Sequence, residues 1–280
     1  MSRPLEDTAD EVRRARRLGR GIGAFNVVLL EHAEAIVAGA ERAGLPVVLQ
    51  ISQNCVAYHG AFAPIGLAAL ALARRASVPV VVHLDHAEDP DLVREAVAAG
   101  VGSVMFDGSR LPYEQNLAAT RAVVAHCHAH GVVVEAELGE VGGKDGVHAP
   151  GARTDPAEAA AFVAATGVDW LAVAVGTSHA MVERVATADV DLIQALAAAL
   201  DVPLVLHGSS GLSDEELAGA VRAGITKVNV ATHLNVLFTT ALRAALDVPR
   251  PPVDPRRYVA AGRAAVAGEV ERLLRLLAAA

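Results

Sequence analysis

The chain has 280 residues, a formal net charge of −8, 53% hydrophobic residues and only 3% aromatic residues. A chain of this length can bury a large core, and an apolar core of Ala, Val, Leu and Ile is typical of parallel strands covered by helices. We therefore expect one α/β domain over residues 1–280. The acidic balance and the lack of a basic stripe exclude nucleic acid as the main partner.

Charged residues, Gly or Pro interrupt every apolar run before it reaches the roughly 20 residues of a spanning helix, so no membrane partner is expected. The first residues mix acids with arginines and contain no apolar signal core. Cys55 and Cys127 offer no disulfide framework. These features together predict a cytoplasmic protein.

Short β-branched runs alternate along the chain with Ala-rich helical stretches, as in repeated βα units. Helix patterns such as Asp89–Ala99 and Asp155–Thr166 begin with Asp-Pro and are followed by Gly. The expected strands, in chain order, are Gly21–Asn26, Val47–Ser52, Val80–Asp85, Ser103–Asp107, Val132–Leu138, Trp170–Val175, Leu204–Gly208 and Lys227–Val230. Eight units between about residues 21 and 246 predict a (β/α)8 TIM barrel, and residues 254–280 a final helix that covers it.

Three histidines follow different strands of this predicted barrel, where its catalytic groups are expected. His86, His179 and His207 come after the third, sixth and seventh runs, so their imidazoles can point into one barrel mouth. Three histidine nitrogens with one open position are typical of catalytic zinc. Glu137 and Asp107 could orient a histidine or take an alternative metal position. The sequence therefore predicts one catalytic Zn²⁺.

Five segments, in chain order, resemble the class II fructose-bisphosphate and tagatose-bisphosphate aldolases. They read HLDHAED, EAELGEVGGKDG, VGTSHA, LVLHGSSG and KVNVAT, and the resemblance extends from Asn26 to Arg256. It implies reversible cleavage of a ketose 1,6-bisphosphate, with fructose 1,6-bisphosphate favoured. The products would be dihydroxyacetone phosphate and glyceraldehyde 3-phosphate, formed through a zinc-stabilised enediolate.

The resemblance also assigns roles to individual residues. Asp85 would exchange the proton of the C4 hydroxyl, and Arg256 would reach the distal phosphate of a neighbouring subunit, which implies a homodimer or homotetramer. A monovalent cation, Na⁺ or K⁺, would bind beside the dihydroxyacetone-phosphate end. The remaining substrate-binding positions would be Asn26, Ser52, Gly176, Gly208, Ser209, Ser210, Asn229 and Thr232.

The Gly-rich stretch Leu138–Pro150 corresponds to a lid that carries a proton-abstracting carboxylate in the family. Asp145 is at the matching position, where the family usually has Glu, and Glu140 is an alternative. The chain also departs from the family after His179, where Ala180 replaces a common Gly, which places phosphate contacts from that loop in doubt.

Other functions are still open. The substrate could be tagatose 1,6-bisphosphate or a phosphorylated deoxy-ketogluconate, since these differ only in hydroxyl configuration or a terminal carboxylate. A zinc amidohydrolase would need His-x-His at the end of the first strand, which here reads Ala24-Phe25-Asn26. A non-catalytic barrel that binds sugar phosphates is the third alternative, and the presence of Asp85 disfavours it.

Overall fold

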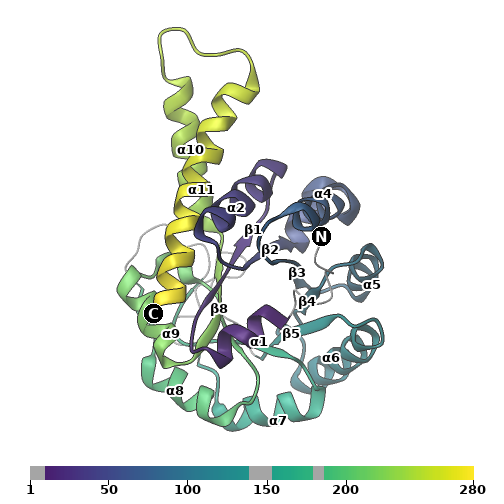
Figure 1. Cartoon of the computed structure of the whole chain (residues 1–280). Coiled ribbons are helices and arrows are strands. Elements are labelled where there is room, and N and C mark those ends of the chain that lie inside the picture. The colour runs from purple at the N-terminus through teal and green to yellow at the C-terminus, as the bar shows by residue number, and fades with distance from the viewer. Residues whose placement is uncertain (1–9, 139–152, 179–185) are drawn as a thin grey trace.

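The computed structural model describes residues 10–138, 153–178 and 186–280. Within these residues, parallel strands pair in chain order and the last pairs with the first, which closes a barrel (Figure 1). The strands are β1 (Ile22–Asn26), β2 (Val47–Ser52), β3 (Val80–Ala87), β4 (Ser103–Phe106), β5 (Val133–Glu137), β6 (Trp170–Val173), β7 (Leu204–Leu206) and β8 (Ile225–Val230). The predicted TIM barrel is confirmed.

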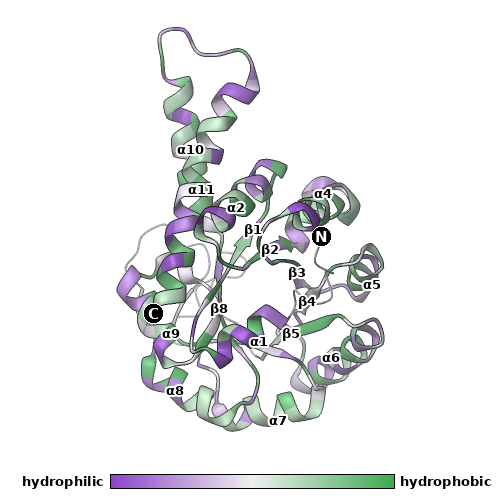
Figure 2. Ribbon diagram, in the orientation of Figure 1, coloured by the Kyte–Doolittle hydropathy of each residue, from purple (hydrophilic) through white to green (hydrophobic). Residues whose placement is uncertain are grey.

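Helices surround this barrel, and several begin and end as the sequence predicts. Asp89 and Asp155 cap α5 and α7 by accepting hydrogen bonds from backbone amides, and Pro occupies the first turn of each. The helices are α1 (Asp10–Arg17), α2 (Leu30–Ala43), α3 (Gln53–His59), α4 (Phe62–Arg75), α5 (Pro90–Ala99), α6 (Tyr113–His128), α7 (Pro156–Thr166), α8 (Val190–Ala199), α9 (Asp214–Ala223), α10 (Thr232–Leu246) and α11 (Pro255–Ala279). Most show both hydrophobic and hydrophilic segments, as expected for helices with one buried side (Figure 2).

The interior of the barrel is apolar at the amino-terminal ends of the strands. Side chains from seven strands pack there with two residues of α1, in a cluster separate from the larger core between strands and helices: Val12, Ala15, Ile22, Ala24, Val48, Val81, Met105, Val133, Trp170, Ala172 and Val205. Trp170 is completely buried. This layer is the floor of the barrel, so polar groups above it are shielded from solvent on that side.

The last helix differs from the expectation that it simply covers the barrel. Its carboxyl-terminal end does so: the carbonyl of Leu277 accepts a hydrogen bond from the amide of Gly21 at 2.8 Å. With 25 residues, however, α11 is about 37 Å long, and its first turns lie beyond the barrel. There it runs beside α10, and the two form an arm that projects from the molecule (Figure 1).

No single helix among the described residues is both long and apolar enough to cross a membrane. Only together are the helices α3 and α4 long and apolar enough for a membrane span, and they are bent by 112° relative to each other.

Candidate metal centre and active site

Polar side chains follow the apolar floor at two-residue steps along the strands. Residues two apart in a strand point to the same face, so β3, β5 and β7 continue from the floor into polar positions, and β8 adds Lys227 and Asn229. The inward side chains of this polar layer are His83, Asp85, Glu135, Glu137, His207, Lys227 and Asn229, and all but Asn229 are at most 2% exposed. Charged groups therefore fill the carboxyl-terminal half of the barrel interior.

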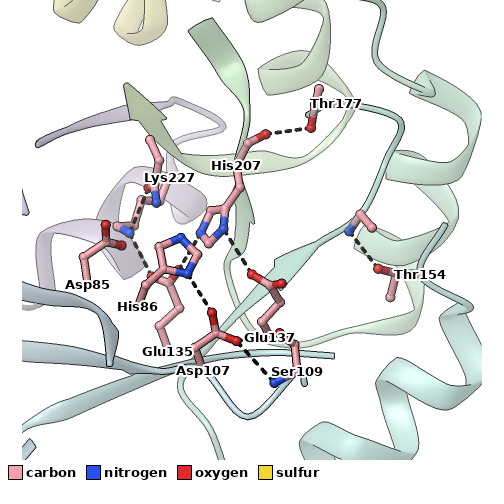
Figure 3. A network of polar contacts seen from close by, with 12 residues as sticks. Asp85, His86, Asp107, Ser109, Glu135, Glu137, Thr154, Thr177, His207 and Lys227 are labelled. Carbon is pink, nitrogen blue, oxygen red and sulfur yellow. Dashed lines mark hydrogen bonds and ion pairs between the residues drawn. The ribbon is translucent and has the colours of Figure 1, made fainter. Parts of the chain in front are cut away.

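Within this layer, His86, Glu137 and His207 each offer a donor atom within 4.8 Å of the other two. The rings of His86 and His207 have their centroids 4.8 Å apart, and Nδ1 of His207 lies 3.2 Å from Oε2 of Glu137. Asp107 follows β4 and places Oδ2 2.8 Å from Nδ1 of His86 (Figure 3). Three of the five predicted metal-site residues thus bring ligand atoms together, and a fourth, Asp107, contacts one of the three.

A local backbone distortion brings His86 into this cluster. Asp85 already points inward, so an ordinary strand would turn His86 to the opposite face. Instead, the pairing of β3 with β4 shifts register between Leu84 and Ala87, and His86 has φ of 47°. It is the one residue other than glycine with positive φ in the described part of the chain. The consecutive side chains of Asp85 and His86 consequently both reach the site (Figure 3).

The imidazole of His207 lies between two buried carboxylates. Its Nε2 is 3.1 Å from Oε1 of Glu135, and its Nδ1 faces Glu137. Burial alone would lower the pKa of His207, but hydrogen bonding to Glu135 and Glu137 outweighs burial and raises the pKa to about 9. The ring is therefore protonated at neutral pH until a cation displaces its proton.

Glu135 and Lys227 have no role among the residues predicted from the sequence. In the structure, Nζ of Lys227 lies 2.8 Å from Oε2 of Glu135, and both side chains are completely buried. Burial would raise the pKa of Glu135, but the charge of Lys227 and the bond to His207 hold it well below its usual value. The two-residue spacing from Glu137 and from Asn229 is the sequence signal that could have identified both.

Asp85 is held by a short chain of amides from the first two strands. Nδ2 of Asn26 donates to Oδ2 of Asp85 at 3.0 Å, and Gln50 donates to Oδ1 of Asn26 at 3.0 Å. Burial would raise the pKa of Asp85, but the charges of His86, Lys227 and His83 outweigh it and lower the pKa. The carboxylate is therefore ionised, and its buried Oδ1 has no hydrogen-bond partner among the described residues. Such a buried polar atom calls for a partner that binds there.

Turns after β7 and β8 bring backbone amides together beside the metal cluster. Gly208 has φ of 67°, and a Cβ there would lie 2.6 Å from backbone atoms of Ser178, so only Gly fits. Ser209 donates its hydroxyl hydrogen to the carbonyl of Asn229, and Ser210 Oγ accepts from the amide of His233 at 3.3 Å. Thr232 begins α10, which has no side-chain cap. The backbone amides at this helix start, that of His233 being bonded to Ser210, suit an anion.

The remaining predicted residues are placed as follows. Ser52 pairs with Asp85 across β2 and β3, and its Oγ caps α3 by accepting from the amide of Cys55 at 3.2 Å. Gly176 lies at the end of β6 with φ of 98°. Arg256 is far along the arm on α11, with its side chain 88% exposed. His179, Asp145 and its alternative Glu140 lie outside the described residues.

The donor set fits a divalent metal ion. Two imidazoles and one carboxylate are the ligand types that zinc takes in catalytic sites, and ring nitrogens of both histidines contact further carboxylates, as metal-bound histidines usually do. A cation at this point would offset the negative charges of Glu137 and Asp107, next to His86, which follows Asp85 directly in the chain. Chemically, the site combines a Lewis-acid position with an adjacent ionised base.

Comparison with known proteins agrees with this geometry. The model of the family described as fructose-bisphosphate aldolase class-II matches residues 6–280. A 6-phospho-5-dehydro-2-deoxy-D-gluconate aldolase of Shouchella clausii (strain KSM-K16) is 38% identical over 269 residues, covering 95% of this chain and 92% of that protein.

Among solved structures, the YdjI aldolase from Escherichia coli K12 has a TM-score of 0.83 and 30% identity, over 96% of this chain and 95% of that one. A putative fructose-1,6-biphosphate aldolase from Coccidioides immitis has a TM-score of 0.83 and 31% identity, over 95% of each chain. On the strength of the matched family, the shared barrel and the site at its mouth, the chain belongs to the class II fructose-bisphosphate aldolases and is a carbon–carbon lyase.

Proposed function

We propose that this aldolase is metal-dependent and cleaves a phosphorylated ketose into dihydroxyacetone phosphate and an aldehyde. The observation that carries the proposal is the ionised, partly unsatisfied Asp85 directly beside the cluster of His86, Glu137 and His207. A retro-aldol reaction needs these two elements side by side, because one accepts a hydroxyl proton while the other stabilises charge on the neighbouring ketone oxygen.

His86 and His207 would hold a Zn²⁺ ion, with Glu137 or Asp107 nearby and His179 as the predicted third histidine. When bound, the ion supplies Lewis-acid stabilisation of negative charge on the substrate ketone oxygen. The donor types support zinc, and the contact of Asp107 with His86 supports an orienting role for that carboxylate. The monovalent cation beside the phosphate segments remains a prediction.

In the cleavage direction, Asp85 takes the proton from the C4 hydroxyl. The bond between C3 and C4 then breaks, C4 becomes the aldehyde carbon, and the electron pair stays with the ketose fragment, which is protonated at C3. Asp145, or Glu140 in its place, is the predicted proton donor for C3. The hydrogen bond from Asn26 fixes Oδ2 of Asp85, so Oδ1 is the oxygen available for the C4 hydroxyl.

The phosphate of the dihydroxyacetone end would lie against the amides of Gly208 to Ser210 and the start of α10. The left-handed Gly208 and the start of α10, whose N-cap residue makes no side-chain hydrogen bond, support this position, because consecutive backbone N–H groups bind anions without lysines. Asn229 would contact the same end of the substrate, and Gly176, Asn26 and Ser52 are the further predicted contacts.

Fructose 1,6-bisphosphate is the first candidate substrate. The second is 6-phospho-5-dehydro-2-deoxygluconate, which the relative at 38% identity favours by its name. Cleavage of that molecule also releases dihydroxyacetone phosphate, but the other product carries a carboxylate instead of a phosphate. Tagatose 1,6-bisphosphate is a third candidate, with the same products as fructose 1,6-bisphosphate. The buried free thiols of Cys55 and Cys127 support a cytoplasmic location.

A coupled assay for dihydroxyacetone phosphate across the three candidate ketoses tests the proposal. We expect one substrate to be cleaved with a clearly higher kcat/KM, activity to be lost in EDTA, and zinc to restore it. Activity that survives complete metal removal and is abolished by borohydride would refute the metal-dependent route. Cleavage of none of the three, with amide hydrolysis or mere sugar-phosphate binding instead, would favour the rival barrel functions.

The raised pKa of His207 predicts pH-dependent zinc binding. Because the protonated ring must lose a proton to bind a metal, zinc affinity should rise about tenfold per pH unit from pH 7 towards about 9 and level off above it. Competition with a chromophoric chelator at several pH values measures this slope. The same raised pKa stabilises the metal-free chain fully below pH 6.5, and this contribution is lost as pH rises through about 9. A flat affinity profile between pH 7 and 9 would contradict the assignment.

Replacing the base should separate chemistry from metal binding. Asp85→Asn keeps the shape of the side chain but removes its charge, so kcat should fall by about 10²–10⁴-fold while zinc content stays at the wild-type level. Steady-state kinetics and metal analysis of the purified variant measure both. Asp91→Asn, on the exposed face of α5, is the matched control and should leave kcat unchanged.

We further propose that Arg256 acts in the site of a second subunit. The helix α11 begins at the far end of the arm, where Arg256 is paired only with Asp254 among the described residues (Figure 1). Exposed apolar residues along the arm, Val236, Val248 and Val253, support a second copy as its partner. An exposed guanidinium suits either a distal phosphate or a distal carboxylate.

Mixing two inactive variants tests this arrangement. In a dimer of one Arg256→Ala chain and one Asp85→Asn chain, one of the two sites has both an intact base and an intact arginine. Re-associated mixtures should therefore recover up to about a quarter of wild-type activity, because half of the dimers are mixed and each has one complete site. If Arg256 served its own chain, mixing would restore nothing.

A further inference from the structure

Lys227 is a buried cation with no direct part in the proposed chemistry. It lies on β8 inside the barrel and is completely buried. Its ammonium group donates to Oε2 of Glu135 at 2.8 Å (Figure 3). It also donates to Oδ1 of Asn229 at 2.9 Å. These two bonds hold the ammonium between strands β5 and β8 and direct it at the carboxylate of Glu135.

The other oxygen of Glu135 contacts the candidate metal ligand His207. Oε1 lies 3.1 Å from Nε2 of His207, and the contact is shielded from solvent on all sides because both side chains are completely buried. An ionised carboxylate only accepts hydrogen bonds, so Nε2 must carry a hydrogen. The nitrogen left for a metal is then Nδ1, which faces Glu137 and His86.

We propose that Lys227 and Glu135 form a positioning pair that fixes the ring orientation and the tautomer of His207 for metal binding. The inference rests on the proposed metal centre. Lys227 keeps Glu135 charged and in place, and Glu135 in turn holds Nε2–H of His207. A carboxylate behind a metal-bound histidine raises the basicity of the ligand nitrogen, and its loss usually costs 10–100-fold in metal affinity.

A purely structural role explains the pair less well. Buried ion pairs contribute little net stability, since well-packed apolar residues of similar volume do as well or better. The floor of the same barrel is built from such apolar residues, among them Val133, two positions before Glu135 on β5. Charge at this level is therefore explained by what it does to His207.

Zinc affinity of variants tests the inference without relying on catalysis. We expect Glu135→Gln and Lys227→Met each to raise the dissociation constant for Zn²⁺ by about 10–100-fold in chelator competition above pH 9, where His207 of the wild type has already lost the proton that competes with zinc. Because a single change leaves a buried charge without its partner and could impair folding, the double variant Lys227→Met/Glu135→Leu is also needed. It should unfold in urea near the wild-type midpoint and still bind zinc at least about 10-fold more weakly.

Thr177→Val is the matched control. Its hydroxyl donates to the backbone carbonyl of His207 at 2.6 Å, so the variant perturbs the same residue without touching its ring, and zinc affinity should stay within about twofold of wild type. In ¹⁵N-histidine spectra of the zinc-bound wild type, the ring proton of His207 should be on Nε2 and shifted downfield by its bond to Glu135. That shift should be lost in Glu135→Gln.

The outcomes distinguish this inference from the proposed function. A folded double variant that binds zinc as tightly as wild type, or a ring proton on Nδ1, would overturn the positioning role while the metal centre stands. Equal losses in Thr177→Val would overturn it as well, since any disturbance of His207 would then suffice. If the wild-type chain bound no zinc, the proposed metal centre would fail first and the inference with it.

Discussion

The site depends on charge buried above an apolar floor. Inside the barrel, Glu135 and Glu137 both contact the ring of His207, and Lys227 forms an ion pair with Glu135. Carboxylates in such surroundings are costly unless they are paired with cations or hydrogen-bonded. The balance leaves negative charge near Glu137 and Asp107, and a divalent cation is the group that would neutralise it. Cation binding and the stability of the barrel interior are therefore coupled.

Neighbouring groups shift the pKa values of Asp85 and His207 in opposite directions. Asp85 loses its proton readily because His86, Lys227 and His83 surround it, whereas His207 keeps its proton because two carboxylates face it. Strands β3 and β8 supply the cations beside Asp85, and β5 supplies both carboxylates beside His207. The distorted backbone at His86 is what allows a base and a metal ligand to come from consecutive residues.

Much of this arrangement could be predicted from the sequence. Strand ends in a TIM barrel meet at one rim, so Asp85, His86 and His207 could be grouped although about 120 residues separate the outer two. The roles of Glu135 and Lys227 are not predicted, because both residues lie inside strands. The apolar pattern there identifies the strand but gives no function to a single polar residue within it. The arm formed by α10 and α11 is also not predicted. The periodicity of the sequence indicates a long final helix, but it does not show that part of this helix extends beyond the barrel. The roles of individual residues, the third histidine and the lid base remain predictions.

The apolar floor restricts how the substrate reaches the site and how the products leave it. Trp170 and α1 close the amino-terminal end of the barrel. Reactants and products must therefore enter and leave at the carboxyl-terminal rim. Both fragments of a cleaved substrate therefore leave from the same end of the barrel at which the substrate entered.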